Sequence, residues 1–455
     1  MNRPQFPAAD LTVRRALLDD AATVLDRNWR GDHTVPSGEL YPHQWSWDAA
    51  FIAIGRSWID QQRAQAEIEH LFTGQWSNGM VPHIVFNHDV PDDAYFPGPM
   101  FWRSDRADAS PTDVATSGIT QPPLHARAVL EVFLRATDRR TAHTFVERMY
   151  PKLVAQHEHL RNVRDVAGHG LAAIVHPWES GMDNSPAWDD DLAAVRIPPG
   201  ALPDYERRDL AHADARDRPS DATYDRFVYL AAAYRDAGYD DADLARTCPF
   251  LVEDPLFNSV WVWSLDALAD LAVLVGDDPA PHRHAAATVS QALRRRLWDA
   301  RARRFCARDV GGGRRSPEDT ITSLVPVLDA RLAAATVDTI AALLDSPEFR
   351  PRNDPGHFMV PSFDLRARGF DPRRYWRGPI WINTDWLLWR GLTKHGRTRV
   401  ANEIAASMVG LVRRSGWREY FSPFGGHGFG SDDFSWSAAL IIDLLHRNAR
   451  GTRGP

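Results

Sequence analysis

The amino-acid sequence predicts an all-α protein. Apolar residues recur at the i, i+3, i+4 and i+7 spacing of a helix over most of the chain, and the strict alternation of a half-buried strand is scarce. About eleven or twelve helical segments follow one another through loops, without the alternation of strands and helices that builds a parallel sheet. No low-complexity or Ser/Gly-rich linker divides the 455 residues, so we expect a single domain over residues 1–455.

The helices are expected in chain order, beginning with residues 11–28, where LTVRRALLDDAATVLDRNW shows the helical period. Residues 257–276 form the most hydrophobic segment, but Asp266 and Asp270 interrupt it, which favours a buried helix over a membrane-spanning one. APHRHAAATVSQALRRRLW repeats the helical pattern over 281–298. The other expected helices are 47–72, 122–137, 142–163, 225–237, 331–345, 379–395, 398–414 and 434–448. Short strands are expected near 304–324, where the glycines at 311–313 are typical of a hairpin turn.

Composition and charge exclude several classes of protein. Apolar residues make up 44% of the chain and charged residues 25%, as in globular proteins with a large core. The net charge is −7 and the 53 basic residues are dispersed among 60 acidic ones, so neither a nucleic acid nor a membrane is expected as a partner. Cys248 and Cys306 are far apart and form no metal motif, and the first residues lack the apolar core of a signal peptide. We therefore expect a cytoplasmic protein.

Three long connections are expected to form the walls of a functional site. They span residues 77–121, 176–224 and 349–378, beyond the roughly 12–15 residues usual for loops in compact domains. They contain Trp, Tyr, His, Gly and Pro rather than a disordered composition, and the length of the first two makes them candidates for a lid. The chain also has 17 tryptophans, whose flat rings suit stacking on a sugar or base where they do not serve the core.

Four segments combine acidic, aromatic and turn-forming residues. They are YPHQWSWDAAF (41–51), HPWESGMDNSPAWDDD (176–191), YWRGPIWINTDW (375–386) and EYFSPFGGHGFGSDDFSWSA (419–438). The second is expected to be a loop, because Pro177 and Pro186 break helices and Gly, Asn and Ser form turns. A site requires that all four segments gather at one end of the helical assembly.

Asp183 and Glu419 are the two carboxylates that these segments offer for acid–base chemistry. Hydrolysis of a glycosidic bond needs one protonated carboxyl group at the leaving oxygen and one ionised carboxylate. Asp183 lies beside Trp178 and Met182, and partial desolvation there would raise its pKa, as a general acid requires. Glu419, beside Arg418, suits a base that activates water. On separate loops the two can stand about 6.5–9.5 Å apart, as in inverting enzymes.

Each of these residues also has a purely structural interpretation. Asp183 is compatible with a helix or turn cap, Glu419 with a surface position or an arginine partner, and Asp48 with the acidic first turn of a helix. In RPSDATYDRF (218–227), Ser220 or Asp221 makes a good helix cap. The same stretch places Arg218 six residues before Tyr224, where the guanidinium and the tyrosine could clamp a small carboxylate.

Eight short stretches of sequence, in order from about residue 41 to 440, form one set of motifs. They are YPHQWSWDAAFIAIG, QWSNGMVPHIVF, YFPGP, SGITQPP, WESGMDNSPAWD, RPSDATYD, YWRGPIWIN and EYFSPFGG with the later FSWSAA. Jointly they resemble glycoside hydrolase family 63, and most of all its bacterial mannosylglycerate and glucosylglycerate hydrolase branch. The resemblance implies an (α/α)6 barrel with long loops as active-site wall and lid, and an inverting hydrolase of α-linked sugars that needs no metal or organic cofactor.

The resemblance also implies roles for particular residues. Asp183 becomes the general acid and Glu419 the general base. The positions matching the sugar-binding subsite are Tyr41, Trp47, Asp48, His83, Gln121, Trp178, Glu179, Tyr375, Trp376, Gly378 and Trp381. The positions matching the glycerate side are Arg218, Tyr224 and Tyr95.

Two stretches depart from the family pattern. The lid region HDVPDDAYF (88–96) has extra acidic residues, which do not favour an anionic aglycone, and Gly425 stands where the pattern leads one to expect threonine. Both bear on the aglycone rather than on the chemistry. We expect 2-O-α-D-glucosyl-glycerate as the substrate, with mannosylglycerate next and a neutral α-disaccharide or oligosaccharide as the alternative.

Two other classes of function remain open from the sequence. A sugar epimerase or isomerase on a related barrel would need a pair of histidines as acid and base, and nothing local marks two of His43, His83, His176 and His427 as such a pair. A non-catalytic sugar binder would tolerate loss of Asp183 or Glu419, yet both stand within their full motifs. The sequence leaves the oligomeric state open, a homo-oligomer included.

Overall fold

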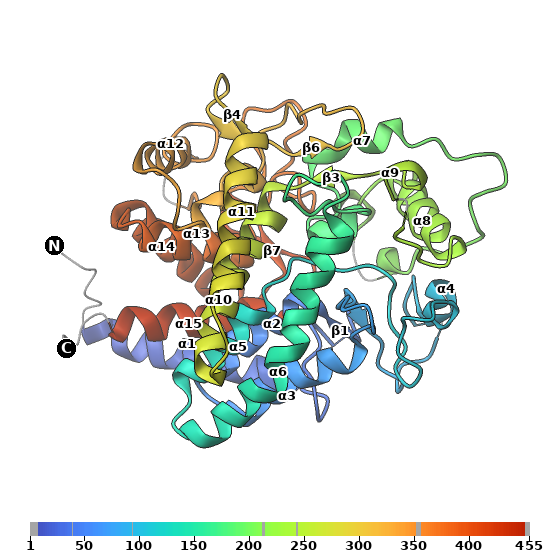
Figure 1. Ribbon diagram of the computed structural model, residues 1–455. Helices are drawn as coiled ribbons and strands as arrows, with labels where there is room; N and C mark the ends of the chain where they lie inside the picture. Colours follow the sequence, from blue (N-terminus) through green and yellow to red (C-terminus); the bar gives the residue numbers. More distant parts are fainter. Residues whose placement is uncertain are drawn as a thin grey trace.

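The computed structural model describes residues 8–38, 40–92, 94–211, 214–242, 244–351 and 356–450. Six of its inner segments form a closed ring in which each packs on the next (Figure 1). In ring order these are α2 (Ser46–Arg56), α5 (His125–Arg135), α10 (Pro255–Val275), the short 3-10 helix η9 (Val325–Leu328), α13 (Ile382–Lys394) and α15 (Ser435–Arg450), which packs again on α2. The fold is therefore the all-α barrel that was expected.

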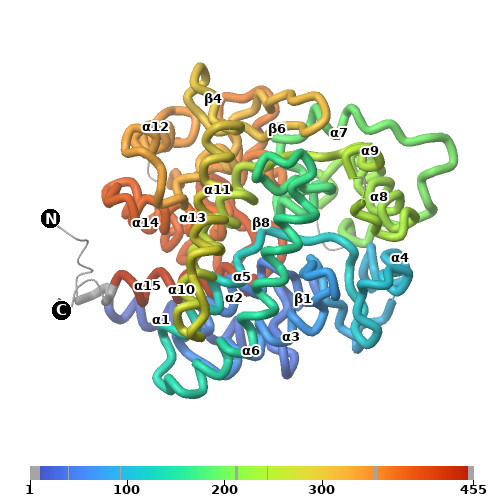
Figure 2. The backbone as a smooth tube through the Cα atoms, in the orientation of Figure 1, coloured from blue at the N-terminus to red at the C-terminus, as the bar shows by residue number. Residues whose placement is uncertain are grey.

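A second layer of helices surrounds this ring. α1 (Ala8–Arg27) packs on α15, α3 (Gln61–Leu71) on α2, α6 (Arg139–His159) on α5 and α10, α11 (Ala280–Arg296) on α10, and α14 (Thr398–Ser415) on α13. α12 (Ala334–Leu344) follows α11 in the chain. The first and last helices, α1 and α15, lie side by side, on the left in Figure 2. The ring is thus closed by helices from opposite ends of the sequence.

The inner helices are buried because their sequences are apolar on nearly every side. All eleven residues of α2 are buried, and α10 buries fifteen residues between Pro255 and Ala272. Asp254 caps α10 through a bond from the Phe257 amide, and Gly276, with φ +77°, ends it. By length and composition α10 could cross a membrane, but two thirds (67%) of its most hydrophobic window is buried inside the protein. It is a core helix, as the interruption by Asp266 and Asp270 predicted.

The prediction of one helix over 47–72 was wrong. α2 ends at Arg56, and Asp60 starts a new helix, α3, by accepting hydrogen bonds from the amides of Gln62 and Arg63. The fourth segment of the inner ring also differs from the others, because short 3-10 helices stand there in place of a long α-helix. It is filled by η8 (Ile321–Ser323) and η9, and Pro326 stands at the start of η9.

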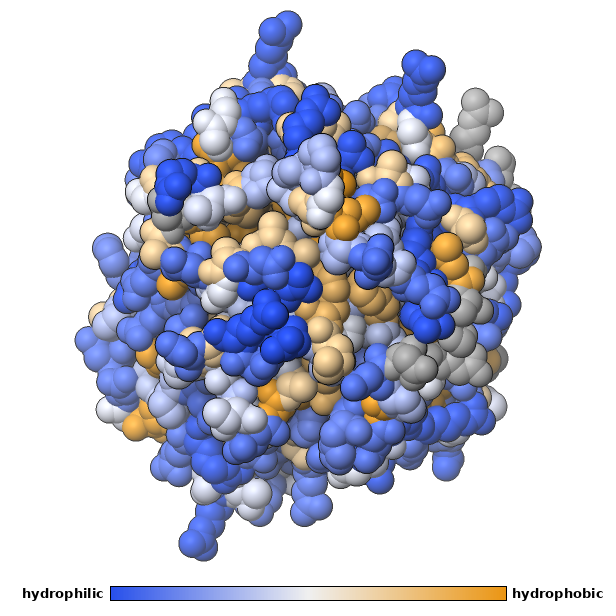
Figure 3. Space-filling model, turned by 90° about the vertical axis from the view of Figure 1, so that its right-hand side faces the viewer, coloured by the Kyte–Doolittle hydropathy of each residue, from blue (hydrophilic) through white to orange (hydrophobic). Residues whose placement is uncertain are grey.

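Short elements occupy the long connections. α4 (Pro99–Trp102) and α7 (Asp189–Ala194) lie within the predicted loops 77–121 and 176–224, and α9 (Leu244–Thr247) follows α8 (Asp221–Asp236). These loops and α8 project from one side of the barrel, on the right in Figure 1. Seen from that side, mildly hydrophobic residues form a band across the centre of the face, among hydrophilic ones (Figure 3).

The strands are two-residue antiparallel pairs. β1 (Gln44–Trp45) pairs with β2 (Ile84–Val85), β3 (Val252–Glu253) with β6 (Arg308–Asp309), β4 (Trp298–Asp299) with β5 (Arg304–Phe305), and β7 (Tyr420–Phe421) with β8 (Gly428–Phe429). The expected turn at 311–313 is present, since Arg308 bridges to Arg315 across it. The pairs near residues 44 and 420 were not expected, because two residues are too few to show a strand period.

Candidate active site

One narrow cavity, of about 110 Å³, opens among the long loops at one end of the barrel. All four acidic and aromatic segments contribute to it: Trp47 and Asp48 at the start of α2, Asp183 from the 176–191 loop, Trp381 just before α13, and Glu419 just before β7. The amino-terminal ends of the inner helices therefore face this cavity. The gathering that the sequence argument required is present.

Most of the residues singled out from the sequence line this cavity. These are Asp183, Glu419, Tyr41, Trp47, Asp48, His83, Tyr95, Gln121, Trp178, Arg218, Tyr224, Tyr375, Trp376 and Trp381. Glu179 and Gly378 are not among its lining residues. For Glu179 and Gly378 the structure does not support direct contact with a substrate. Their surroundings instead give each of them a structural role in its motif.

Glu179 holds the Asp183 loop in place. Its side chain is fully buried and accepts hydrogen bonds from the amides of Val175 (2.7 Å) and Thr120 (3.1 Å), and from Arg164 Nη1 (2.9 Å). Both carboxylate oxygens are thus occupied by donors within the protein. Gly181, two residues after Glu179, has φ +71°, and a Cβ there would lie 2.4 Å from the Trp47 ring. Only glycine lets the loop pass this close to Trp47 with that backbone conformation.

Gly378 has a comparable backbone function in the third segment. Its φ is +156°, and a Cβ there would lie 2.3 Å from the carbonyl oxygen of Asp371. Its amide donates to Ser362 Oγ at 3.1 Å. The close approach of the two chain segments sets the position of the turn that carries Tyr375 and Trp376 to the cavity.

The surroundings of Asp183 favour the protonated form of its carboxyl group. Burial raises its pKa to about 7, an effect that the Arg218 guanidinium opposes and the Glu419 carboxylate reinforces. The loop around it is fixed to the neighbouring segment, because Asn184 Oδ1 accepts from the Trp376 amide at 3.0 Å and Trp188 Nε1 donates to the Asp183 carbonyl at 3.0 Å. A carboxyl group with these surroundings is protonated in a large fraction of molecules near neutral pH.

Glu419 is held on both oxygens. Tyr41 OH donates to Oε1 at 2.8 Å and the Ser431 amide donates to Oε2 at 3.0 Å. Burial raises its pKa, while Arg218 and these donors favour the ionised form. Gly430, with φ +68°, lies so close that a Cβ there would be 2.2 Å from Oε2. The glycine-rich stretch after Pro423 is therefore a turn that lets the backbone approach the carboxylate.

Arg218 is a buried cation that forms no ion pair with any residue that the structure describes. Its Nη1 and Nη2 lie 3.2 and 3.3 Å from Tyr41 OH, and its guanidinium stands 4.8 Å from the centre of the Tyr375 ring. Only 5% of the residue is exposed, and its Nε has no hydrogen-bond partner. Within the described part of the chain no carboxylate lies within 4.0 Å of it. A cation desolvated in this way has free capacity for an anionic ligand.

Aromatic rings form the remaining walls. Trp376 and Trp381 stack with ring centres 3.9 Å apart, Trp178 lies parallel to His83 at 6.2 Å, and Tyr95 meets Trp45 edge-on at 5.4 Å. Flat apolar faces beside carboxylates are what a pyranose ring requires, since it has an apolar face and a polar rim.

Several lining residues were not singled out from the sequence. They include Trp45, Arg208, Asp209, Phe434 and Trp436. Trp45, Phe434 and Trp436 lie in two of the four segments that the sequence analysis selected, so membership of those segments could have indicated them as lining residues. Arg208 and Asp209 have no such signal, because charged residues in a long loop are usually solvated and their approach to the cavity is decided by how the loop folds.

Comparison with known proteins gives consistent matches over most of the chain. A family model described as the mannosylglycerate hydrolase MGH1-like glycoside hydrolase domain matches residues 41–437. A mannosylglycerate hydrolase of Rubrobacter radiotolerans is 41% identical over 94% of this chain and 96% of its own length. A glucosylglycerate hydrolase of Mycolicibacterium hassiacum is 35% identical over 97% of this chain and 99% of its own length.

A solved structure shares the fold. It is the GH63 mannosylglycerate hydrolase from Thermus thermophilus in complex with Tris and D-glycerate, with a TM-score of 0.87 and 38% identity over 94% of this chain and 99% of that one. The family-model match, residues 41–437, begins with the first of the four segments that meet at the cavity and ends within the fourth.

Proposed function

The chain belongs to the mannosylglycerate hydrolase MGH1-like glycoside hydrolases of family 63, and from this premise we propose that its substrate is an α-glycoside of glycerate. The best candidates are 2-O-α-D-glucosyl-glycerate and mannosylglycerate, and the products are a hexose and glycerate. Relatives of both names, at 41% and 35% identity, support this pair.

The observation that carries the proposal is the unpaired guanidinium of Arg218. A neutral disaccharide would leave that buried guanidinium without a direct ion pair, with Glu419 as a nearby but not contacting charge, whereas a glycerate carboxylate would supply an ion pair and could accept two parallel hydrogen bonds. Tyr224 and Tyr95, which line the same cavity, offer hydroxyl donors to the same group. The narrowness of the cavity also favours a small glycoside over an oligosaccharide.

We assign the chemistry to Asp183 and Glu419 in an inverting mechanism. Asp183 donates its proton to the glycosidic oxygen as the bond to the anomeric carbon breaks. Glu419 accepts a proton from a water molecule that attacks the opposite face of that carbon. The raised pKa of Asp183 and the donors around Glu419 support this division of roles. Asp48, buried at the same wall, suits hydrogen bonds to sugar hydroxyls.

The test of the proposal is proton NMR of the first sugar anomer released from glucosylglycerate, mannosylglycerate and kojibiose in separate incubations. We expect β-hexose to appear first from a glycosylglycerate, with the α-anomer arising only by slow mutarotation, and no comparable release from kojibiose. α-Hexose as the first product would exclude inversion. Preferred cleavage of kojibiose would exclude glycerate as the aglycone.

An epimerase is less well supported by the same cavity. Epimerisation would need two histidines facing the sugar, and among the described residues His83 is the one histidine that lines the cavity. Burial lowers the pKa of His83 well below its ordinary value, so it serves as a neutral hydrogen-bonding group. His176 is bonded instead to the Phe227 carbonyl at 2.9 Å.

We propose further that the enzyme works in the cytoplasm. Cys248 and Cys306 are both free thiols in the structure, which suits a reducing compartment. Fractionation of cells that produce the protein, followed by immunoblotting, tests this location, and recovery outside the cytoplasmic fraction would contradict it.

Substitution of Arg218 by alanine is expected to raise KM for a glycosylglycerate about 10–150-fold, the range of one lost hydrogen bond to a charged group. KM for a neutral α-glucoside should change far less, because that substrate never engages the cation. The measurement is steady-state kinetics of both substrates. Arg216→Ala is the matched control, since Arg216 is exposed two residues away and pairs with Asp214. Equal losses on both substrates would contradict the carboxylate clamp.

The pH profile of kcat/KM is expected to be bell-shaped. Asp183 must be protonated, so activity falls about tenfold for each pH unit above its pKa of about 7. Glu419 must be ionised, so activity also falls as pH decreases through its pKa, which burial raises above the ordinary value. Initial rates from pH 4 to 9 at low substrate measure both limbs. A rate that stays constant from pH 6 to 9 would contradict Asp183 as the acid.

A further inference from the structure

A second cavity, of about 890 Å³, lies at the opposite end of the barrel from the active site. The active site is lined by residues at the amino-terminal ends of the inner helices, such as Trp47 in α2 and Trp436 in α15. The second cavity is lined by residues in the carboxyl-terminal halves of α13 and α15, such as Lys394 and Arg447, together with Arg127 in the first turn of α5. Its size is that of a small-molecule site.

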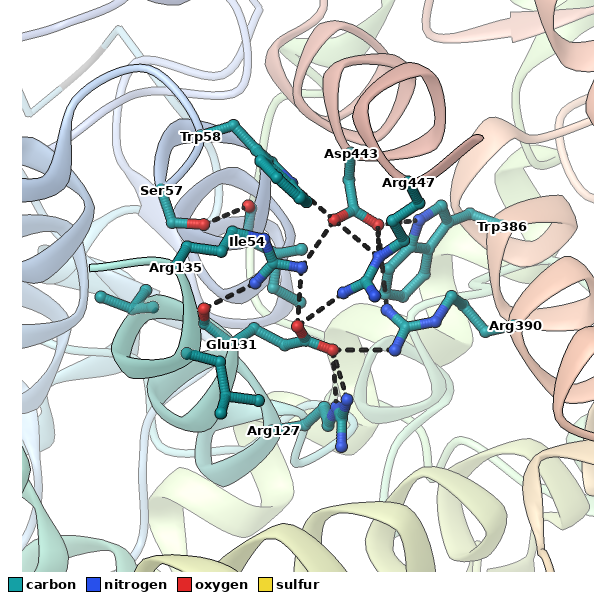
Figure 4. Close-up of polar contacts among 12 residues, drawn as sticks. Ile54, Ser57, Trp58, Arg127, Glu131, Arg135, Trp386, Arg390, Asp443 and Arg447 are labelled. Carbon is teal, nitrogen blue, oxygen red and sulfur yellow. Dashed lines mark hydrogen bonds and ion pairs between the residues drawn. The ribbon is translucent and has the colours of Figure 1, made fainter. Parts of the chain in front are cut away.

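Four arginines and two acids form a cluster of polar contacts (Figure 4), and part of this cluster belongs to one wall of the cavity. Glu131 accepts from Arg127, Arg135 (2.6 Å), Arg390 (2.8 Å) and Arg447 (2.5 Å). Asp443 accepts from Arg135 (2.8 Å) and Arg447 (2.8 Å), and from the indole nitrogens of Trp58 (2.8 Å) and Trp386 (3.0 Å). Four guanidinium groups thus share two carboxylates, which leaves two positive charges uncompensated.

Three of these arginines line the cavity: Arg127, Arg390 and Arg447. The bonds to Glu131 and Asp443 come from Nε and Nη2 of Arg127 and Arg447 and from Nη2 of Arg390. Among the described residues no hydrogen bond from any of the three Nη1 atoms is found. Arg390 Nη1 is buried without a partner, 3.8 Å from Asp443. Burial and the neighbouring arginines lower the pKa of Arg390 to about 10, which agrees with an excess of positive charge.

The remaining lining indicates what the ligand would carry besides negative charge. Arg283 and Lys394 add two exposed cations, and Arg331 pairs with Asp266, which leaves Asp270 as the other acid of the wall. Neutral hydrogen-bonding side chains complete it: Thr393, Thr398, Asn402 and Asn448. Such groups suit hydroxyl groups. A phosphate dianion matches the two uncompensated charges, and the cavity is far larger than phosphate alone.

We propose that this cavity binds the phosphate monoester of a small hydroxylated molecule, with the phosphate on Arg127, Arg390 and Arg447. A ligand there would join α5, α13 and α15 through one anion, so it would stabilise the ring of inner helices from the end opposite the catalytic carboxylates. This makes the cavity an effector site, independent of which glycoside the active site hydrolyses.

The experiment is isothermal titration of the whole protein with sorbitol 6-phosphate, inorganic phosphate and sorbitol, with thermal unfolding in parallel. Sorbitol 6-phosphate has no pyranose ring for the active-site tryptophans. We expect one site per chain for sorbitol 6-phosphate, weaker binding of phosphate, none of sorbitol, and a rise in Tm with the phosphorylated ligand. Affinity should fall at least tenfold in Arg283→Ala/Lys394→Ala, whose exposed side chains are not needed for folding, and in Arg390→Lys. Arg413→Ala, at an exposed arginine outside the cavity, is the matched control.

Two outcomes would overturn the proposal. Absence of heat and of any Tm shift with all three compounds would mean that the arginines only pair with Glu131 and Asp443 and bind no ligand. Binding that survives Arg390→Lys and Arg283→Ala/Lys394→Ala but disappears in Arg218→Ala would place the anion in the catalytic cavity instead.

Discussion

Substitution of Asp183 by asparagine is expected to lower kcat on a glycosylglycerate about 10²–10⁴-fold, the usual contribution of a general acid. Asparagine has nearly the same shape but no proton to donate at neutral pH, so the glycosidic oxygen must leave as an alkoxide. KM should change little, because the cavity walls and Arg218 are untouched. The measurement is steady-state kinetics at pH 6, where the wild-type carboxyl group is largely protonated.

A substrate that needs no acid separates this chemical role from damage to the site. Fluoride leaves without protonation, so Asp183→Asn should hydrolyse the matching α-glycosyl fluoride at a rate close to that of the wild type. Asp190→Asn, at an exposed carboxylate in the same loop, is the matched control and should behave as wild type on both substrates. Equal loss on the fluoride and on the glycoside would show that Asp183 does not act as the acid.

The same substitution should make stability less dependent on pH. Because the pKa of Asp183 is raised to about 7 in the folded protein, its stabilising effect is complete below the ordinary pKa of an aspartate and is lost as pH rises through 7. Asparagine has no charged form to bury. The Tm of Asp183→Asn should therefore exceed that of the wild type at pH 8, and the difference should shrink toward pH 4.

The extent to which the sequence determines the fold can be argued from α2, α3 and η9. Helical periodicity reports which residues face apolar surroundings, and it located the long helices correctly. It missed the break at residues 57–60, where the capping side chain of Asp60 was visible but the apolar pattern continued. It gave no sign of the ring, because closure depends on α15 packing on α2, a contact between the two ends of the chain.

The candidate site was more predictable than the fold around it, because its residues lie in short stretches with unusual composition. The distinction between a residue that lines the cavity and one that supports it was not available. Glu179 lies in the same motif as Asp183, and only the approach of Arg164 and of the Thr120 amide shows that its oxygens are occupied. Arg218 illustrates the converse. The sequence predicted it as a binding residue, but only the folded chain shows that no described residue forms an ion pair with it, which supports an anionic substrate.

Substitution of Glu419 by glutamine is expected to lower kcat about 10²–10⁴-fold on the glycosylglycerate and equally on the glycosyl fluoride. The reason is that water must lose a proton during its attack whichever group leaves. The glutamine amide can still meet Tyr41 OH and keeps nearly the same shape, so the loss should fall on kcat rather than on KM. Rates on both substrates, with near-UV circular dichroism to monitor the aromatic walls, provide the measurement.

The two carboxylate variants together distinguish the general acid from the general base. A residue that acts as acid is dispensable when the leaving group is fluoride, and a residue that acts as base is not. If Glu419→Gln keeps its activity on the fluoride while Asp183→Asn loses it, the roles are reversed. If both variants lose the same factor on both substrates, the carboxylates support the site without transferring protons. The expected pattern, with Asp183 bypassed and Glu419 required, follows from a pKa of about 7 at Asp183 and from the hydrogen-bond donors that hold Glu419 as a carboxylate.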